Sequence, residues 1–290
     1  MEDKLITYGG QALIEGVMMR GRKSCALAMR APDGQIVTKV EPLSGIYKTR
    51  IAKVPFLRGL IMLWDSLGLG MRALTDSANL QTGEEEKLEG PALYLLLSLT
   101  FLIGIGIFFL IPAGVGWLTE HFLHWNAWWS NFLEGILRLL MLVGYIWGIG
   151  FAPDIARVFA YHGAEHKTIN AYEDGADLTP GSVARYSVAH TRCGTAFLLT
   201  LVVLSLFVFT LLGPLPLGWR LLSRILMIPV LAGAAYEYLR WTADHVDSPF
   251  VRFIIKPNLA LQSLTTRQPD EQMLEVAIAA FHMMRKAEEE

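Results

Sequence analysis

The sequence is poor in cysteine and in charged residues. Its 290 residues include two cysteines, Cys25 and Cys193, which are too few for a disulfide framework, so we expect both thiols to be reduced in the cytoplasm. Charged residues make up 18% of the chain, below the roughly 25% of an ordinary soluble domain. No long basic run is present that would suggest a nucleic-acid partner. The first thirty residues contain no apolar core of a signal peptide.

Apolar residues are abundant instead. They make up 53% of the chain, and the mean hydropathy is +0.38. A helix needs roughly 20 apolar residues to cross a bilayer, and four segments are long enough. We therefore predict an α-helical integral membrane protein with about four transmembrane helices and the lipid bilayer as its partner. The segments are 91–117, which glycines and Pro112 should tilt or kink, 132–151, 195–213 and 217–239.

The basic residues predict the orientation of these spans. The linker 118–131 contains three tryptophans and no Lys or Arg, a composition typical of the outer membrane surface. The linker 154–194 contains four Lys or Arg, and the first eighty residues contain eleven. Because positive charge favours the inner side, we expect both termini and the linker 154–194 to face the cytoplasm.

The remaining segments predict a small α+β cytoplasmic domain. We divide the chain into an N-terminal strand and amphipathic-helix region, two pairs of spans, a polar linker and C-terminal helices. The N-terminal region is 1–90, and the two pairs of spans are 91–153 and 195–241. The polar linker is 154–194, and the C-terminal helices are 242–290.

Local patterns predict the elements of that domain. Residues 24–30 and 35–40 look like strands around a turn, and 9–21 is an apolar stretch with glycines that permit close backbone approach. The amphipathic pattern of 54–80 predicts a helix on the membrane surface or on the strands. Asp270 is expected to cap a last helix.

The strongest chemical signal is the pattern His-x-x-Glu-His in the polar linker. In a helix, His162, Glu165 and His166 lie at i, i+3 and i+4 and leave one face together. The pattern is the inverted form of a zinc-protease signature. Glu173 falls on nearly the same helix face as His162, although it lies at the expected helix end. Two imidazoles one turn apart predict a metal site.

A second pair of ligand types precedes the third span. His190 and Cys193 are three residues apart, and a reduced thiol is a legitimate ligand beside imidazoles. We predict His162 and His166 as first ligands, completed by Glu165, His190, Cys193 or Glu173. Zinc suits such nitrogen, sulfur and oxygen donors, with iron or manganese next if carboxylates dominate. The alternative is a structural metal site, or a cluster that only hydrogen-bonds within itself.

Two other carboxylates are candidates. Glu15 lies among apolar residues and glycines, where burial would raise its pKa and suit proton transfer. Glu237 lies in the fourth apolar segment, and a pairing with Arg240 three residues later would explain it structurally.

Four sequence blocks resemble one family. They are GGQALIEGVMMRG at 9–21, YHGAEHK at 161–167, HTRCGT at 190–195 and LTTRQPD at 264–270. Together they resemble the YqhQ-like family of bacterial membrane proteins, catalogued as a domain of unknown function and labelled a predicted metal-dependent enzyme. The resemblance implies a multi-pass protein of the bacterial cytoplasmic (inner) membrane. It implies no reaction, substrate, metal or oligomeric state.

We therefore expect a metal-dependent membrane enzyme, a hydrolase of a lipid-linked or membrane-peptide substrate, acting at the cytoplasmic face. Glu165 or Glu15 would move protons. The alternative is a non-enzymatic factor whose partner is a protein translocation, insertion or assembly machinery, with a structural histidine cluster. A transporter is disfavoured because four spans without repeat symmetry offer little material for a pathway.

Overall fold

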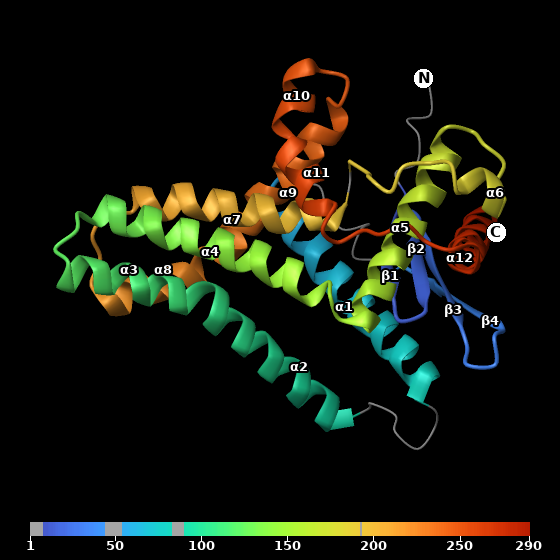
Figure 1. The fold of residues 1–290 in the computed structure, drawn as a ribbon, viewed down its shortest axis with the longest axis horizontal. Helices are drawn as coiled ribbons and strands as arrows, with labels where there is room; N and C mark the ends of the chain where they lie inside the picture. The colour runs from blue at the N-terminus through green and yellow to red at the C-terminus, as the bar shows by residue number, and fades with distance from the viewer. Residues whose placement is uncertain (1–7, 44–53, 83–89, 192) are drawn as a thin grey trace.

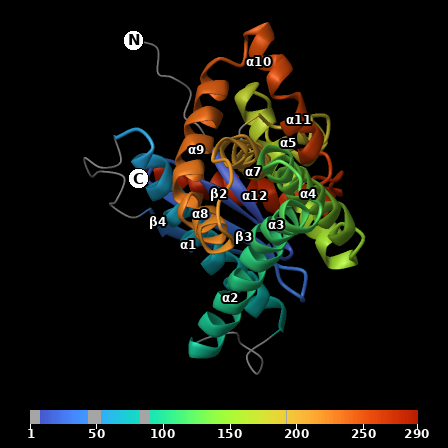
Figure 2. The same cartoon turned by 90° about the vertical axis from the view of Figure 1, so that its left-hand side faces the viewer.

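Two regions of different construction make up the molecule. The computed structural model describes residues 8–43, 54–82, 90–191 and 193–290. Long helices form a bundle at one end, and a small sheet covered by helices lies at the other (Figure 1). Turned by 90°, the bundle is seen nearly end-on in front of the sheet (Figure 2).

The sheet is an antiparallel meander with the strand order β1-β2-β3-β4. The expected strand 24–30 is confirmed as β3. The glycine-punctuated stretch before it, for which no strands were predicted, forms a hairpin whose last pair is Leu13 and Gly16. The strands are β1 (Gly9–Leu13), β2 (Gly16–Arg20), β3 (Ser24–Arg30) and β4 (Ile36–Pro42).

Helices cover both faces of this sheet. Side chains alternate between the faces of a strand, so Val17 and Met19 point to one side and Met18 to the other. The first side packs against α5 (Pro153–Glu173) and α12 (Glu271–Glu289), with the short α6 (Pro180–Val183) beside them. The other packs against α1 (Leu57–Thr82). Asp270 caps α12 as expected, because its Oδ1 accepts the Met273 N–H at 2.8 Å.

Helix α1 connects the sheet to the bundle. The predicted amphipathic helix is confirmed, and its Leu69 and Ala73 lie on the sheet. Its first turns pack against α9 (Ile228–Asp244), where Arg58 of α1 forms an ion pair with Glu237. Arg240, the expected partner, contributes its charge beside Glu237, whereas the hydrogen bonds come from Arg58 of α1.

Three described helices are long and apolar enough to cross a membrane, or four if one bent pair is counted as a single span. The first runs continuously from Gly90 to Phe122, and a π-helical turn joins its two α-helical parts. The bent pair turns by 41° at Met227, where Pro229 cannot donate a helical hydrogen bond. The elements are α2 (Gly90–Ile105), η4 (Gly106–Leu110), α3 (Ile111–Phe122), α4 (Ala127–Ile149), α7 (Gly194–Leu211) and α8 (Leu217–Leu226) with α9.

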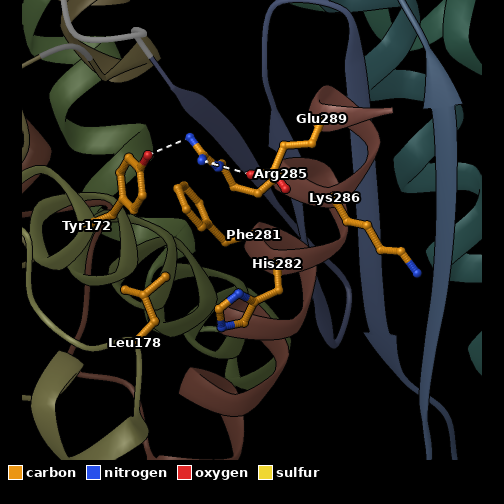
Figure 3. A pocket seen from close by; sticks show the side chains of 7 residues that line it. All are labelled: Tyr172, Leu178, Phe281, His282, Arg285, Lys286 and Glu289. Atoms are coloured by element: carbon orange, nitrogen blue, oxygen red, sulfur yellow. Dashed lines mark hydrogen bonds and ion pairs between the residues drawn. The ribbon is translucent and has the colours of Figure 1, made fainter.

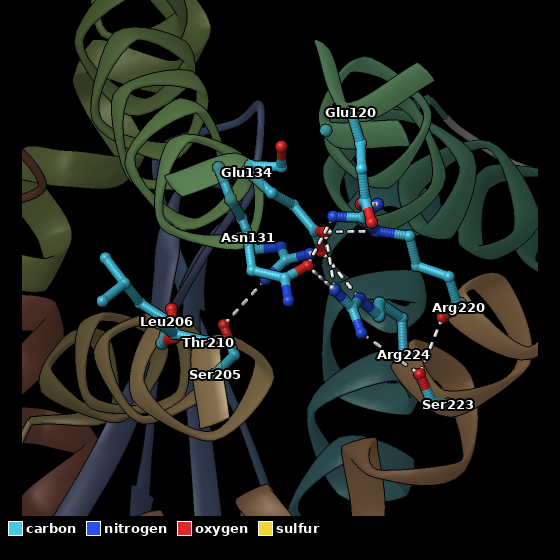
Figure 4. A network of polar contacts seen from close by, with 12 residues as sticks. Glu120, Asn131, Glu134, Ser205, Leu206, Thr210, Arg220, Ser223 and Arg224 are labelled. Atoms are coloured by element: carbon cyan, nitrogen blue, oxygen red, sulfur yellow. Dashed lines mark hydrogen bonds and ion pairs between the residues drawn. The ribbon is translucent and has the colours of Figure 1, made fainter. Parts of the chain in front are cut away.

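A buried ionic network holds one end of the bundle together (Figure 4). Glu134 of α4 accepts hydrogen bonds from Arg138 at 2.8 Å, from Arg224 at 2.7 and 2.8 Å, and from Arg220 at 3.3 Å. All four residues are at most 1% exposed. Arg220 also pairs with Glu120 of α3 at 2.7 Å. The network ties α3, α4 and α8 together, which the sequence did not lead us to expect.

Candidate metal centre

Helix α5 positions the predicted motif. It begins at Pro153, a residue suited to a first helical turn, and Gly175 follows its end with a φ of +74°. His162, Glu165 and His166 all lie within it, so the expected helical spacing is confirmed. His166 is 1% exposed and Glu165 is 4% exposed.

The glycine inside the motif allows another segment to run against the helix. A Cβ atom on Gly163 would lie 2.0 Å from the backbone oxygen of Arg267. The Arg267 N–H donates to the Phe159 carbonyl at 2.9 Å. This close approach brings the carbonyl of Thr265 to the His162 ring, so Gly163 is required for the backbone contact that holds the histidine.

Both imidazoles are oriented by backbone carbonyls. Nδ1 of His162 lies 2.9 Å from the Thr265 oxygen, and Nδ1 of His166 lies 2.6 Å from the Val188 oxygen. A carbonyl can only accept, so each Nδ1 carries a proton and donates it. In a neutral ring Nε2 is then the unprotonated nitrogen, the form that binds a metal.

Cys193 meets these two nitrogens. It is the N-cap residue of α7, and its Sγ accepts the Thr195 N–H at 3.4 Å. Nε2 of His162 lies 3.2 Å from this sulfur, and the ligand atoms of His162, His166 and Cys193 all lie within 4.8 Å of one another. Two imidazoles and a thiol from separate segments therefore converge on one point.

The three groups change one another's pKa. Burial disfavours the charged form of His162, but the hydrogen bond and charge of the Cys193 sulfur outweigh it and raise the pKa of His162 to about 9. Burial also disfavours the charged form of His166, but the hydrogen bond with the Cys193 sulfur and nearby negative charge outweigh it, so the pKa of His166 is raised as well. Burial would raise the pKa of Cys193, yet the two imidazoles hold it well below its usual value. The two imidazoles therefore favour the thiolate form of Cys193.

The other predicted ligands lie around this group and not within it. Glu165 Oε2 is 4.0 Å from His162 Nε2. His190 Nε2 is 3.8 Å from Glu173 Oε2, and its ring centroid is 5.5 Å from that of His166. Among the described residues, the grouping with ligand spacing contains only the two α5 histidines and Cys193. Glu165 is the nearest carboxylate to the His162 nitrogen in this arrangement.

Glu15 has a different environment from the one expected. Its carboxylate accepts two hydrogen bonds from Arg157, at 2.5 and 2.6 Å, and one from the Tyr161 hydroxyl at 3.2 Å. The Arg157 guanidinium lowers the pKa of Glu15 and outweighs burial. The expectation of a raised pKa is therefore wrong, and the structure does not group Glu15 with the three ligand types.

Sequence reasoning missed the residues that hold the site in place. Gln262 of α11 (Lys256–Gln262) accepts the His190 N–H and donates to the His190 carbonyl, both at 2.9 Å. Lys167 donates to the carbonyls of Ala184 and Tyr186 at 2.7 and 2.6 Å. The available signals were the blocks 161–167 and 264–270, which carry Lys167 and Thr265, but neither residue had an assigned role.

A surface hollow of about 390 Å³ lies beside α12, away from these ligands. Tyr172 and Phe281 form part of its wall, and Arg285 donates to the hydroxyl of Tyr172 and to Glu289 (Figure 3). None of the predicted site residues lines it.

Comparison with known proteins agrees with the sequence blocks. Residues 54–287 match the family described as "Protein of unknown function (DUF1385)". The chain is 36% identical over 296 residues to "Uncharacterized protein YqhQ" of Bacillus subtilis (strain 168), which covers 97% of this chain and 93% of that protein. No solved structure matches. The expected family is thereby confirmed, and the chain belongs to the DUF1385 family of proteins of unknown function.

Proposed function

We propose that the protein is a metal-dependent hydrolase of the bacterial cytoplasmic membrane, with its site at the cytoplasmic face. The observation that carries the proposal is the convergence of His162, His166 and Cys193 within 4.8 Å. Three such donors leave a fourth tetrahedral position for water or substrate, which is the pattern of catalytic zinc sites. Zinc is the metal that this donor set suits best.

The chain's own groups supply the remaining chemistry. A bound zinc would lower the pKa of a coordinated water and polarise a substrate oxygen. Glu165 lies 4.0 Å from His162 Nε2 and is positioned to take a proton from the attacking water and return it to the leaving group. Arg157 lowers the pKa of Glu15 and makes this carboxylate a weak proton acceptor, so we assign the proton transfer to Glu165 alone. The carbonyls of Thr265 and Val188 keep both imidazoles in the ligating orientation.

Membrane insertion and topology are part of the proposal. The apolar helices α2–α3, α4 and α7, with α8–α9 as a bent fourth span, support insertion. The basic linker before α7 and the basic N-terminal region favour the cytoplasmic side for the ligand cluster. A reporter fused after Asn126 should then be found outside the cytoplasm, and one fused after Asp177 inside. The reverse result would contradict this topology.

The alternative is a non-enzymatic factor of a protein translocation, insertion or assembly machinery with a structural metal site. The low exposure of Cys193, 7%, and of His166, 1%, favours a closed site. Trp64 and Leu67 of α1 are 79% and 60% exposed and offer an apolar surface to a protein partner.

Metal analysis of the purified full-length chain tests the proposal. We expect about one zinc per chain in the wild type, from a single three-ligand site, and close to none in His162→Ala, His166→Ala and Cys193→Ser. His282→Ala is the matched control, because His282 is an exposed histidine of α12 and should leave the metal content unchanged. Near-zero metal in the wild type as well as in these variants would remove the enzyme proposal. If Glu165→Gln keeps the full zinc content and hydrolyses substrate as fast as the wild type, Glu165 does not transfer the proton.

A further inference from the structure

An apolar groove lies between α2 and the rest of the bundle. Its volume is about 380 Å³, within the roughly 300–1,000 Å³ of small-ligand sites. Phe101 and Gly104 of α2 form one wall, and Leu142 of α4 and Val202 of α7 belong to the other. All three helices are among the candidate spans, so the groove lies within the part of the chain that we propose to be in the membrane.

The π-helical turn explains why this space exists. None of the residues of α2 is buried, and this helix, which precedes η4, points away from the bundle at an angle (Figures 1 and 2). A π-helical turn interrupts the regular pattern of backbone hydrogen bonds. Arg138 Nε donates to the Phe108 carbonyl of η4 at 2.9 Å, so the point of divergence is fixed by a buried side chain.

The chemistry of the lining selects a hydrocarbon. Arg138 is the one charged residue of the lining, and its three guanidinium nitrogens already donate to Phe108, Ser205 and Glu134. Its charge is already balanced by the buried carboxylate of Glu134, so this side chain gives the groove no preference for an anionic headgroup. Apolar cavities do not hold water, and an empty space would forfeit dispersion contacts. An alkyl chain is the occupant that satisfies both conditions.

One end of the groove lies close to the ligand cluster. Leu198 lines the groove and follows Cys193 by five residues, a rise of about 7.5 Å along a helix. Leu142 and Val202 also pack in a cluster with Leu264, which directly precedes the residue that holds His162. A lipid chain in the groove would therefore have its polar end near the level of Cys193.

We propose that the groove holds one hydrocarbon chain of a membrane lipid and that the polar end of this lipid is presented to His162, His166 and Cys193. Lipid-linked molecules, and not membrane peptides, are then the substrate class. Chain binding depends on membrane insertion alone, whereas the substrate class rests on the proposed hydrolase.

Photo-crosslinking tests the groove. The full-length chain is placed in phosphatidylethanolamine–phosphatidylglycerol vesicles that contain traces of a diacyl phospholipid with a diazirine in the middle of one chain. Gly104→Leu fills the groove, because nothing lies within 4 Å of a Cβ atom at Gly104. Gly144→Leu is the matched control, since Gly144 is an exposed helical glycine of α4 with equally open space that does not line the groove.

We expect mid-chain labelling of Phe101, Phe108 and Leu198 in the wild type. It should fall about tenfold in Gly104→Leu, because the added side chain takes the place of several methylene groups of the lipid. Gly144→Leu should label like the wild type. Equal labelling of these residues in both variants would overturn the groove as a chain site.

A second probe tests the placement of the polar end. A phospholipid with the diazirine in its headgroup should label the segment around Cys193, and labelling at the α3–α8 end instead would overturn that placement. Zinc is measured on the same preparations. A chain without zinc would remove the hydrolase and the substrate class while leaving the mid-chain result intact, so the two failures are distinguishable.

Discussion

Two buried polar clusters lie towards opposite ends of the bundle, and they differ in the kind of atoms that meet in each. In the Glu134 network the carboxylate accepts from three arginines, and Asn131 accepts from Arg224 at 3.0 Å and donates to the Gly213 carbonyl at 3.1 Å. In the other cluster, the outer nitrogens of His162 and His166 are paired with carbonyls while their inner nitrogens face one sulfur. A carboxylate whose oxygens are paired with several arginines holds helices together, whereas nitrogen and sulfur atoms that point to one position are suited to a metal ion.

The largest effect is expected from Glu134→Gln. Removing this carboxylate leaves three buried guanidinium groups without their common partner, which should lower the free energy of unfolding by about 3–5 kcal/mol. Denaturant unfolding of the full chain in detergent micelles would measure it. Glu120→Gln is the control, since this carboxylate is 25% exposed and Arg220 is its one ion-pair partner among the described residues, and we expect less than about 1 kcal/mol. Equal stability of wild type and Glu134→Gln would show that the network does not hold the bundle.

Gly163→Ala should damage the ligand cluster and spare the network. The added Cβ atom would lie 2.0 Å from the Arg267 oxygen and must displace the segment that holds His162. Loss of a partner that orients a ligand typically costs about 10–100-fold in metal affinity. Competition with a zinc chelator would measure this loss. Gly144→Ala, at an open helical position, should bind zinc like the wild type. Unchanged affinity in Gly163→Ala would mean that the backbone contact does not position the imidazole.

In metal-free protein, the pKa values of the two thiols should be shifted in opposite directions. Burial raises the pKa of Cys25 to about 11, whereas the imidazoles hold that of Cys193 well below its usual value. Ultraviolet absorbance should therefore show a thiolate at neutral pH in Cys25→Ser and none in Cys193→Ser until strongly alkaline pH. Adding His162→Ala to Cys25→Ser removes the main stabilising partner and should move the thiolate transition to higher pH. Identical titrations of the two single-cysteine variants would contradict the ion pairing.

The smallest effect is expected from Arg157→Ala. The side chain is 51% exposed, so solvent screens its ion pair with Glu15, and the loss of stability should stay below about 1 kcal/mol. The metal content should not change, because this pair lies outside the grouping of ligand atoms. Loss of zinc in this variant would mean that the Glu15–Arg157 pair contributes to metal binding.

Local patterns predicted the parts of the fold that local physics determines. The four apolar segments, strand β3, helix α1 and the Asp270 cap are all features of neighbouring residues. The partner of Glu237 was missed because Arg58 is 179 positions away. The Glu134 network was missed for the same reason, since Arg220 and Arg224 come from a helix more than eighty residues later.

The same distinction applies to the site. The α5 motif was predictable from helical spacing, and the order of the chain suggested that Cys193 would start α7. Sequence could not decide which of the candidate ligands converge, because that depends on how Val188 and Cys193 come into contact with the α5 histidines. It placed Glu15 in an apolar setting because its neighbours are apolar, and the guanidinium that lowers its pKa comes from a different element.

The position of Cys193 at the very start of α7 has a mechanical consequence. The sulfur moves with α7, whereas both imidazoles move with α5, which is packed on the sheet. A metal ion bound by the sulfur and both imidazoles would connect α7 to α5 and the sheet. A piston shift of α7 by one residue, about 1.5 Å, is large against a zinc–sulfur bond of about 2.3 Å. Coordination would then depend on how α7 is held relative to α5.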